Sequence, residues 1–162
     1  MSAQTEITKD LTNKKLSVTR KFAAPLDKVW RAWTESDLLE KWWAPRPWRA
    51  ETKTFDFSDG GFWLYSMIGP NGDAAWCRVG FKAINAPQTF STIVGFSDAE
   101  GNIDSNFPMM YWLVVFHATA DGTDVAIEIT FDSEADLEKI VAMGFKEGFT
   151  MALGNLDELL EA

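Results

Sequence analysis

The sequence predicts an α+β fold, in which a curved antiparallel sheet of about seven strands wraps around a long C-terminal helix. Three observations lead to this prediction: alternating apolar and polar residues in segments between residues 16 and 131, turn signals between these segments, and a change to helical periodicity near Ser133. The short connections favour antiparallel pairing, because parallel strands need a longer crossover. Tryptophan-rich stretches and glycines in the last helix further indicate an aromatic cavity between helix and sheet.

The first elements are a strand and two short helices. Apolar and polar residues alternate over 16–22, as in a strand with one buried face. Pro25 follows at a position that suits the first turn of a helix. A second short helix can be capped by Thr34 or Ser36 and ends before Pro45.

Six further strand-like segments follow, separated by turn residues. The strongest hairpin signal is the Gly-Pro-Asn-Gly-Asp sequence at 69–73. The segments are 49–57, 62–68, 75–84, 89–96, 109–119 and 123–131. The polar stretch 97–108 is long for a compact domain, and we expect it to control entry to the cavity.

A single long helix is predicted from about Ser133 to Leu160, because apolar residues recur there at three- and four-residue steps. Gly144, Gly148 and Ala152 lie on or beside the apolar face. A glycine costs about 1 kcal/mol relative to alanine inside a helix, so these positions need a reason. They can allow the helix to pack closely on the sheet, leave space for a ligand, or do both.

The length of 162 residues fits one domain with a substantial core. Residues 1–14 are polar, so we expect a flexible tail followed by a single domain over 15–162. The N-terminal stretch lacks the apolar core of a signal peptide, and no run approaches the roughly 20 apolar residues of a membrane span. We therefore expect a cytoplasmic protein without membrane insertion.

The composition argues against several classes of function. A net charge of −9 without a basic stripe makes nucleic acid an unfavourable partner. The single cysteine excludes an internal disulfide and fits a reducing compartment. Because the chain also has only one histidine, a His/Cys metal cluster cannot be assembled. Nucleophile-elbow, phosphate-loop and dinucleotide motifs are missing. We expect no metal and no cofactor, and we assign no catalytic residue.

A series of short motifs resembles a known family. The order of strand, two short helices, six strands and long helix is that of the helix-grip fold of the SRPBCC superfamily, which includes START and birch-pollen-allergen-like domains. Within it, the chain is similar to the heat-shock-protein-90 ATPase activator-like family over roughly 16–160. The motifs are Arg20-Lys21-Phe22-Ala23-Ala24-Pro25, Val29-Trp30-Arg31-Ala32-Trp33-Thr34, Trp42-Trp43-Ala44-Pro45, Gly60-Gly61, Met67, Pro70-Asn71-Gly72, Ile84-Asn85-Ala86-Pro87 and Gly144-Phe145 through Leu160.

The resemblance implies the fold firmly and the function poorly. Members of the family resemble ligand carriers, resistance proteins, cyclase-like enzymes and a chaperone activator, and fold alone does not decide among them. The eukaryotic activator carries a further N-terminal domain for which this chain has no room. Two positions depart from the family: Ala44 replaces a usual glycine, and Phe145 replaces a common tryptophan.

The resemblance places one face of the segment 62–68 toward the long helix, and we expect the ligand site there. Large aromatic side chains with few rotatable bonds can form a cavity that keeps its shape, and eight tryptophans are available. The expected ligand-binding residues are Trp43, Trp63, Tyr65, Met67, Arg78, Phe96, Trp112, Phe145 and Phe149.

Four polar or reactive residues have alternative interpretations. Arg78 can point into the cavity and bind an oxygen of the ligand, or lie on the outer face. Arg20 shares a strand face with apolar residues, which favours a buried ion pair with an unidentified carboxylate. His117 is a general-base candidate by type, but its place near a strand end favours a structural role. We interpret Cys77 as a buried, inert thiol.

The main functional hypothesis is binding of a small hydrophobic or aromatic molecule, such as a lipid or polyketide. The alternatives are a cyclase- or hydrolase-type enzyme that uses Arg78, Tyr65 or His117 in the same cavity, and an interaction module that acts on a chaperone. The segment 109–118 is apolar on both faces. One face should cover the core, and the other would be an exposed apolar patch. We therefore expect a homodimer that forms through this second face.

Overall fold

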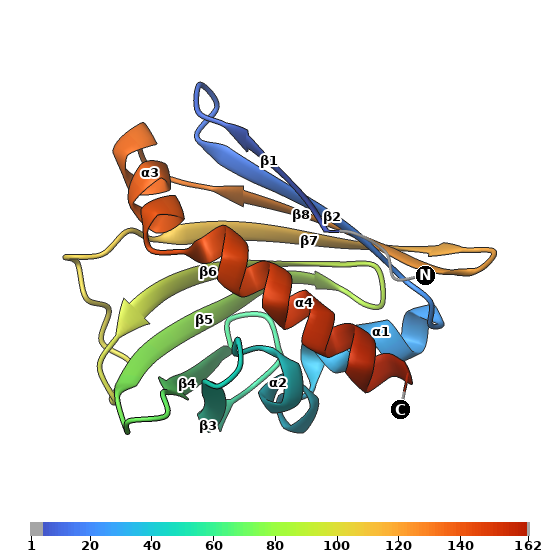
Figure 1. Ribbon diagram of the computed structural model, residues 1–162, viewed down its shortest axis with the longest axis horizontal. Coiled ribbons are helices and arrows are strands. Elements are labelled where there is room, and N and C mark those ends of the chain that lie inside the picture. The colour runs from blue at the N-terminus through green and yellow to red at the C-terminus, as the bar shows by residue number, and fades with distance from the viewer. Residues whose placement is uncertain (1–4, 162) are drawn as a thin grey trace.

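The computed structural model describes residues 5–161, which form one eight-stranded antiparallel sheet that curves around a helix (Figure 1). The strands are β1 Glu6–Asp10, β2 Lys15–Phe22, β3 Arg49–Phe55, β4 Phe62–Ile68, β5 Ala74–Asn85, β6 Thr89–Ser97, β7 Met110–Thr119 and β8 Gly122–Thr130. They are ordered β1-β2-β8-β7-β6-β5-β4-β3. The helices are α1 Leu26–Thr34, α2 Ser36–Trp42, α3 Glu134–Ala142 and α4 Phe145–Glu161. The predicted helix-grip architecture is thereby confirmed.

The core lies between the inner face of the sheet and the helices. Strand β8 shows why: Val125, Ile127 and Ile129 are buried, whereas the alternating Asp124 and Glu128 are exposed. Helix α4 crosses this inner face diagonally, and α1 and α2 lie near its C-terminal half (Figure 1). Burial of the alternating apolar side chains therefore fixes which face of each strand meets the helix.

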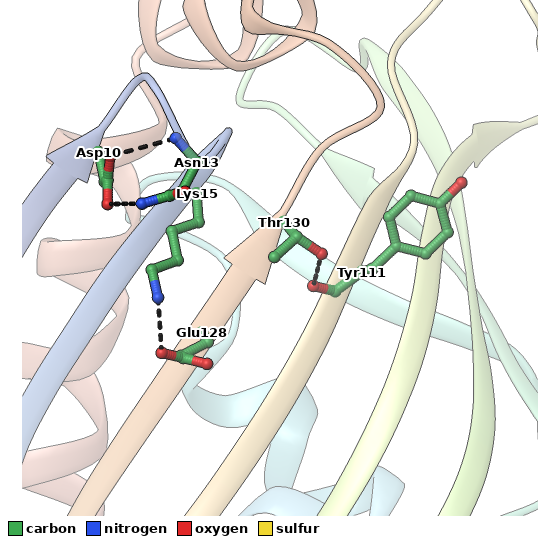
Figure 2. Close-up of polar contacts among 6 residues, drawn as sticks. All are labelled: Asp10, Asn13, Lys15, Tyr111, Glu128 and Thr130. Atoms are coloured by element: carbon green, nitrogen blue, oxygen red, sulfur yellow. Dashed lines mark hydrogen bonds and ion pairs between the residues drawn. The ribbon is translucent and has the colours of Figure 1, made fainter.

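Strand β1 lies within the segment 1–14, for which a flexible tail was expected. Residues 6–10 pair with β2, with Ile7 opposite Val18, and the apolar side chains of Ile7 and Leu11 pack against the core. Asp10 accepts hydrogen bonds from the backbone N and the Nδ2 of Asn13 and closes the turn between β1 and β2 (Figure 2). Two apolar residues and one Asp-based turn are enough to add this edge strand. Residues 1–4 of the expected tail lie outside the described residues.

Polar contacts on the outer face tie neighbouring strands together beside this turn. Lys15 Nζ lies 3.2 Å from Glu128 Oε1 across the β2–β8 pair (Figure 2). Thr130 Oγ1 donates to the backbone oxygen of Tyr111 at 3.5 Å across the β8–β7 pair. These pairs are exposed, so they align strands more than they stabilise the fold.

The C-terminal helix is interrupted, in contrast to the single helix predicted from Ser133. The Ser133 side chain accepts a hydrogen bond from the backbone N of Asp136 and caps α3. Gly144 then adopts φ +91°, which side-chain-bearing residues rarely adopt, and α4 begins at Phe145. The glycine that looked like a helix-packing residue therefore separates two helices that run in different directions (Figure 1).

The segment after α2 is held between α1 and α4. Trp42 Nε1 donates to the backbone oxygen of Ala32 at 2.9 Å. Asn155 of α4 is buried, and its Nδ2 donates to the oxygens of Trp42 at 3.5 Å and Ala44 at 3.2 Å. These bonds satisfy carbonyls at the end of α2 and fix the backbone on both sides of Trp43.

None of the helices in the described range 5–161 has both the length and the apolar character needed to cross a membrane.

Candidate functional site

A cavity of about 230 Å3 lies between the inner face of β4–β7 and the junction of α3 with α4. Its walls are apolar or aromatic with few exceptions. Met143 at the helix junction is one of the wall residues and is half-exposed, so the cavity reaches the surface there. The lining residues are Trp43, Pro45, Tyr65, Met67, Cys77, Val94, Gly95, Phe96, Met110, Trp112, Ile140, Met143, Gly144, Phe145, Gly148 and Phe149.

Most of the residues expected from sequence are brought together here. Seven of the nine line the cavity: Trp43, Tyr65, Met67, Phe96, Trp112, Phe145 and Phe149. They come from the segment after α2, from three different strands and from α4, so only the folded sheet assembles them. Trp63 and Arg78 lie elsewhere.

Trp63 lies one layer behind the wall. It shares the inner face of β4 with Tyr65 and stacks on that ring with a centroid distance of 4.1 Å. Its Nε1 donates to Thr52 Oγ1 at 3.0 Å, which turns the indole toward the neighbouring strand β3. Trp63 therefore supports the wall residue Tyr65 and does not line this cavity.

Arg78 lies on the outer face of the sheet, which corrects its expected place at the ligand site. Successive side chains of β5 alternate, and buried Cys77 takes the inward direction. The Arg78 guanidinium stacks on the outer-face ring of Phe62, with its carbon 4.4 Å from the ring centroid. The alternative that put Arg78 outside is the one that the structure supports.

The 97–108 segment mostly covers the outer face of the sheet instead of the cavity entrance. A Cβ added at Gly95 would meet Met109 Sδ at 2.6 Å and Ile103 Cδ1 at 2.9 Å, so this part of the chain packs directly on β6. Near its end, the Phe107 ring lies 5.0 Å from that of Phe96, which lines the cavity. Control of entry by this segment stays a prediction, and the Phe96–Phe107 contact is the place where it would act.

Interlocked aromatic rings form the inner end of the cavity. The Trp43 ring lies 5.8 Å from that of Trp112 and 6.2 Å from that of Phe149, and it makes an edge contact with Trp33. Phe145 and Phe149 stack on the same face of α4 with a centroid distance of 5.4 Å. Rings in edge and stacked contact hold one another in place, so the cavity has a stiff wall.

The two titratable residues in the lining are Tyr65 and Cys77, which are opposite each other in the β4–β5 pair. Burial raises the pKa of the Cys77 thiol to about 11. Burial, with the neighbouring Cys77 as the next cause, raises the pKa of Tyr65 well above its ordinary value. Both side chains are neutral near pH 7. They can donate or accept hydrogen bonds, but they provide neither a base nor a charge for catalysis.

Sequence reasoning missed several lining residues, Cys77 above all. The signal was present, because the alternation of β5 puts Cys77 opposite the face of Trp76 and Arg78. Once Tyr65 is placed inward, the antiparallel register places Cys77 beside it. The contributions of Ile140 and Met143 depend on the helix break at Gly144, which the apolar spacing did not reveal.

Two other candidates lie outside the cavity. Arg20 is buried and pairs with Asp157 of α4, which identifies the carboxylate that the sequence left open. His117 is exposed near the end of β7, so it takes no part in the cavity. Among residues 5–161, no group of three or more His, Cys, Asp or Glu is arranged to hold a metal ion.

Comparison with known proteins connects this geometry to a family. A profile described as Activator of Hsp90 ATPase homolog 1-like protein matches residues 23–161. No curated protein matches the chain.

Several solved structures are similar over nearly the whole chain. Protein Ms6760 from Mycobacterium smegmatis is 30% identical, with a TM-score of 0.88, and the match covers 96% of this chain and 95% of Ms6760. A protein from Arthrobacter aurescens is 31% identical, with a TM-score of 0.91 and coverage of 96% and 91%. A protein from Staphylococcus epidermidis is 26% identical, with a TM-score of 0.84 and coverage of 96% and 93%. The chain belongs to the Activator of Hsp90 ATPase homolog 1-like family, within the SRPBCC helix-grip superfamily.

Proposed function

We propose that the protein binds a small hydrophobic or aromatic molecule in the cavity between α4 and the sheet. The observation that carries the proposal is the cavity itself: about 230 Å3, walled by aromatic rings and apolar side chains, with two neutral polar groups. Burial of apolar ligand surface supplies affinity at about 25 cal/mol per Å2, and a few polar groups orient the ligand.

The volume narrows the ligand class. An apolar cavity of about 150 Å3 takes one benzene ring. A cavity of about 230 Å3 therefore suits a compact body of about two fused rings, or part of a longer chain that extends past Met143. A flat aromatic body can also stack against Trp43, Phe145 or Phe149.

An enzymatic role has less support from the same site. Of the three residues named for it, Arg78 and His117 face away from the cavity. Tyr65 remains, buried and with a raised pKa. It is suited to hydrogen bonding a ligand oxygen, and it has no charged partner within the lining to help it move a proton.

Native mass spectrometry of the purified protein tests the proposal, with and without a panel of lipids and two- and three-ring aromatic compounds. A one-to-one complex that survives desolvation is expected for at least one class. A protein that stays bare with the whole panel contradicts binding in the cavity. Stimulation of a purified chaperone ATPase by the bare protein would then favour the interaction-module alternative.

A further inference from the structure

Next to the inner end of the cavity lies a second, much smaller cavity of about 20 Å3. Trp43, Val94 and Trp112 line both spaces, so a single layer of side chains separates them. The smaller space is about the size that one water molecule or one ligand oxygen occupies. Several residues of its lining, Trp112 among them, have a polar side-chain atom, which a purely apolar void would not have.

Residues with unpaired polar atoms concentrate around this small cavity. In the described residues 5–161, four buried side-chain nitrogen or oxygen atoms have no hydrogen-bond partner: Arg20 Nε, Trp33 Nε1, Thr92 Oγ1 and Trp112 Nε1. Trp33, Thr92 and Trp112 all line the small cavity, and they are exposed by only 3%, 4% and 5%. A buried polar group without a partner is costly, so three around one space indicate a shared partner.

The fold holds the three residues in place. Thr92 and Trp112 are directly opposite each other in the β6–β7 pair, so their side chains share the inner face of the sheet. Trp33 approaches from α1, where its ring contacts Trp42, Trp43 and Phe116. Neither strand register nor helix packing can change without disturbing the core, so the donors are fixed before any partner arrives.

The hydrogen-bonding chemistry of Trp33, Thr92 and Trp112 determines which partner they can share. An indole N–H only donates a hydrogen bond, whereas a threonine hydroxyl donates or accepts. Trp33 and Trp112 therefore call for an acceptor with lone pairs, and Thr92 can join them with either role. A neutral oxygen fits this set and this volume, whereas an ammonium group or a second N–H donor does not.

We propose that the Trp33–Thr92–Trp112 cavity is a site for one neutral oxygen atom, supplied by a water molecule or by the carbonyl or hydroxyl group of a ligand in the larger cavity. The ligand version rests on the proposed function. It narrows the ligand class to aromatic ketones and phenols, whose ring body occupies the larger cavity. Their oxygen reaches the smaller cavity beside Trp43, Val94 and Trp112, the side chains that line both cavities.

Calorimetry with a matched ligand pair tests the ligand version. 2-Acetylnaphthalene and the hydrocarbon 2-isopropenylnaphthalene have closely similar shapes, and a methylene group of the second replaces the carbonyl oxygen of the first. Thr92→Val is expected to weaken the ketone about fivefold, the effect of one net hydrogen bond, and to leave the hydrocarbon within about twofold. Thr92→Ser, which keeps the hydroxyl, is expected to restore the preference. The control is Thr123→Val, because that buried hydroxyl already bonds Ala24 O at 2.8 Å away from both cavities.

Crystal structures with and without the ketone identify the source of the oxygen. A water bonded to Trp33 and Trp112 in the ligand-free protein, replaced by the ketone oxygen in the complex, supports both versions. A water that stays while the ketone binds assigns the site to water alone. If both compounds bind and Thr92→Val affects them equally, binding in the larger cavity is supported and the ligand version of the oxygen site fails. If neither compound binds, the proposed function fails for this class, and a ligand-free structure without density there overturns the oxygen site as well.

Discussion

The indole Nε1 of Trp43 donates a hydrogen bond to the phenolic oxygen of Tyr65 at 2.7 Å, which joins the segment after α2 to strand β4 across the cavity wall. Tyr65 is 3% exposed, and Trp63 stacks on its other side. Because the bond uses a lone pair of the phenol, the Tyr65 O–H is still able to donate to a ligand. One contact therefore fixes the wall and orients its main polar group.

Removing either partner of this bond should destabilise the fold. Tyr65→Phe leaves the indole N–H unpaired and is expected to lower the free energy of unfolding by about 1–2 kcal/mol in urea titrations. Trp43→Phe should cost more, because it also removes ring contacts with Trp112 and Phe149. The double variant should show a coupling energy of about 1 kcal/mol. Strictly additive effects would mean that the bond contributes nothing to stability.

Two glycines of α4 offer a matched test of the cavity. Gly148 lines it, and a Cβ there would lie 3.7 Å from Pro45 Cγ, whereas a Cβ at Gly154 meets nothing within 4 Å. Gly148→Leu should fill the cavity and weaken binding of a two-ring aromatic ligand at least tenfold, measured by calorimetry. Gly154→Leu carries the same change in helix propensity and should leave binding within about twofold. Equal affinities for the two variants would place the ligand elsewhere.

Adjacent residues of α4, Asp157 and Glu158, each form an ion pair, and the two pairs should differ strongly in their contribution to stability. The Arg20 side chain is 5% exposed and the Asp157 side chain 22%, whereas Arg46 and Glu158 lie 3.0 Å apart at 60% and 62% exposure. Asp157→Asn should cost about 2–3 kcal/mol, because it leaves a buried guanidinium without its counter-charge. Glu158→Gln should cost at most about 0.5 kcal/mol. Chemical denaturation of both variants measures the difference, and similar losses would contradict the burial argument.

The strand pattern made most of the sheet predictable from sequence. In β8, alternation of period two is unbroken, so both the strand and its buried face followed directly. Strand β1 was not predicted because it has one apolar residue, Ile7, and its stability comes from pairing with β2 and from the Asp10–Asn13 turn. A single-residue break was also invisible in the C-terminal helix, since the apolar spacing continues across Gly144.

The cavity was predictable to the extent that strand faces were. Tyr65 and Met67 followed from the alternation of β4 once its inner face was assigned. Arg78 was placed in the cavity because its type suits a ligand oxygen, yet the same alternation puts it outside. Trp63 shows a different limit: strand parity gives the direction of a side chain, but its depth depends on Thr52 and the rings packed around it.

The homodimer expected through the sheet stays a prediction, and the surface that it would use is the outer face of β7. On the outer face of β7, Tyr111 and Val115 are half-buried and Leu113 is 40% exposed, with Ile93 of β6 paired beside Tyr111. Sedimentation velocity at high micromolar concentration should show a dimer, and Leu113→Glu should convert it to a monomer. Met151→Glu, at a position of α4 that is 48% exposed, is the control and should not. A wild-type protein that is strictly monomeric contradicts the prediction.

Burial of Cys77 should make stability fall at alkaline pH. Its pKa is about 11 in the fold against an ordinary value of 9.0, so between these values the unfolded chain has already lost a proton that the folded protein keeps. The contribution of the Cys77 thiol to the free energy of unfolding is fully present below pH 9. It decreases by roughly 2–3 kcal/mol as the pH rises toward 11. The raised pKa of Tyr65 acts in the same direction at higher pH. Urea unfolding at pH 7–11 should therefore give a shallower decline above pH 9 for Cys77→Ala than for wild type. The comparison uses slopes, because the substitution also enlarges the cavity at every pH, and parallel slopes would show that the thiol titrates as it does in water.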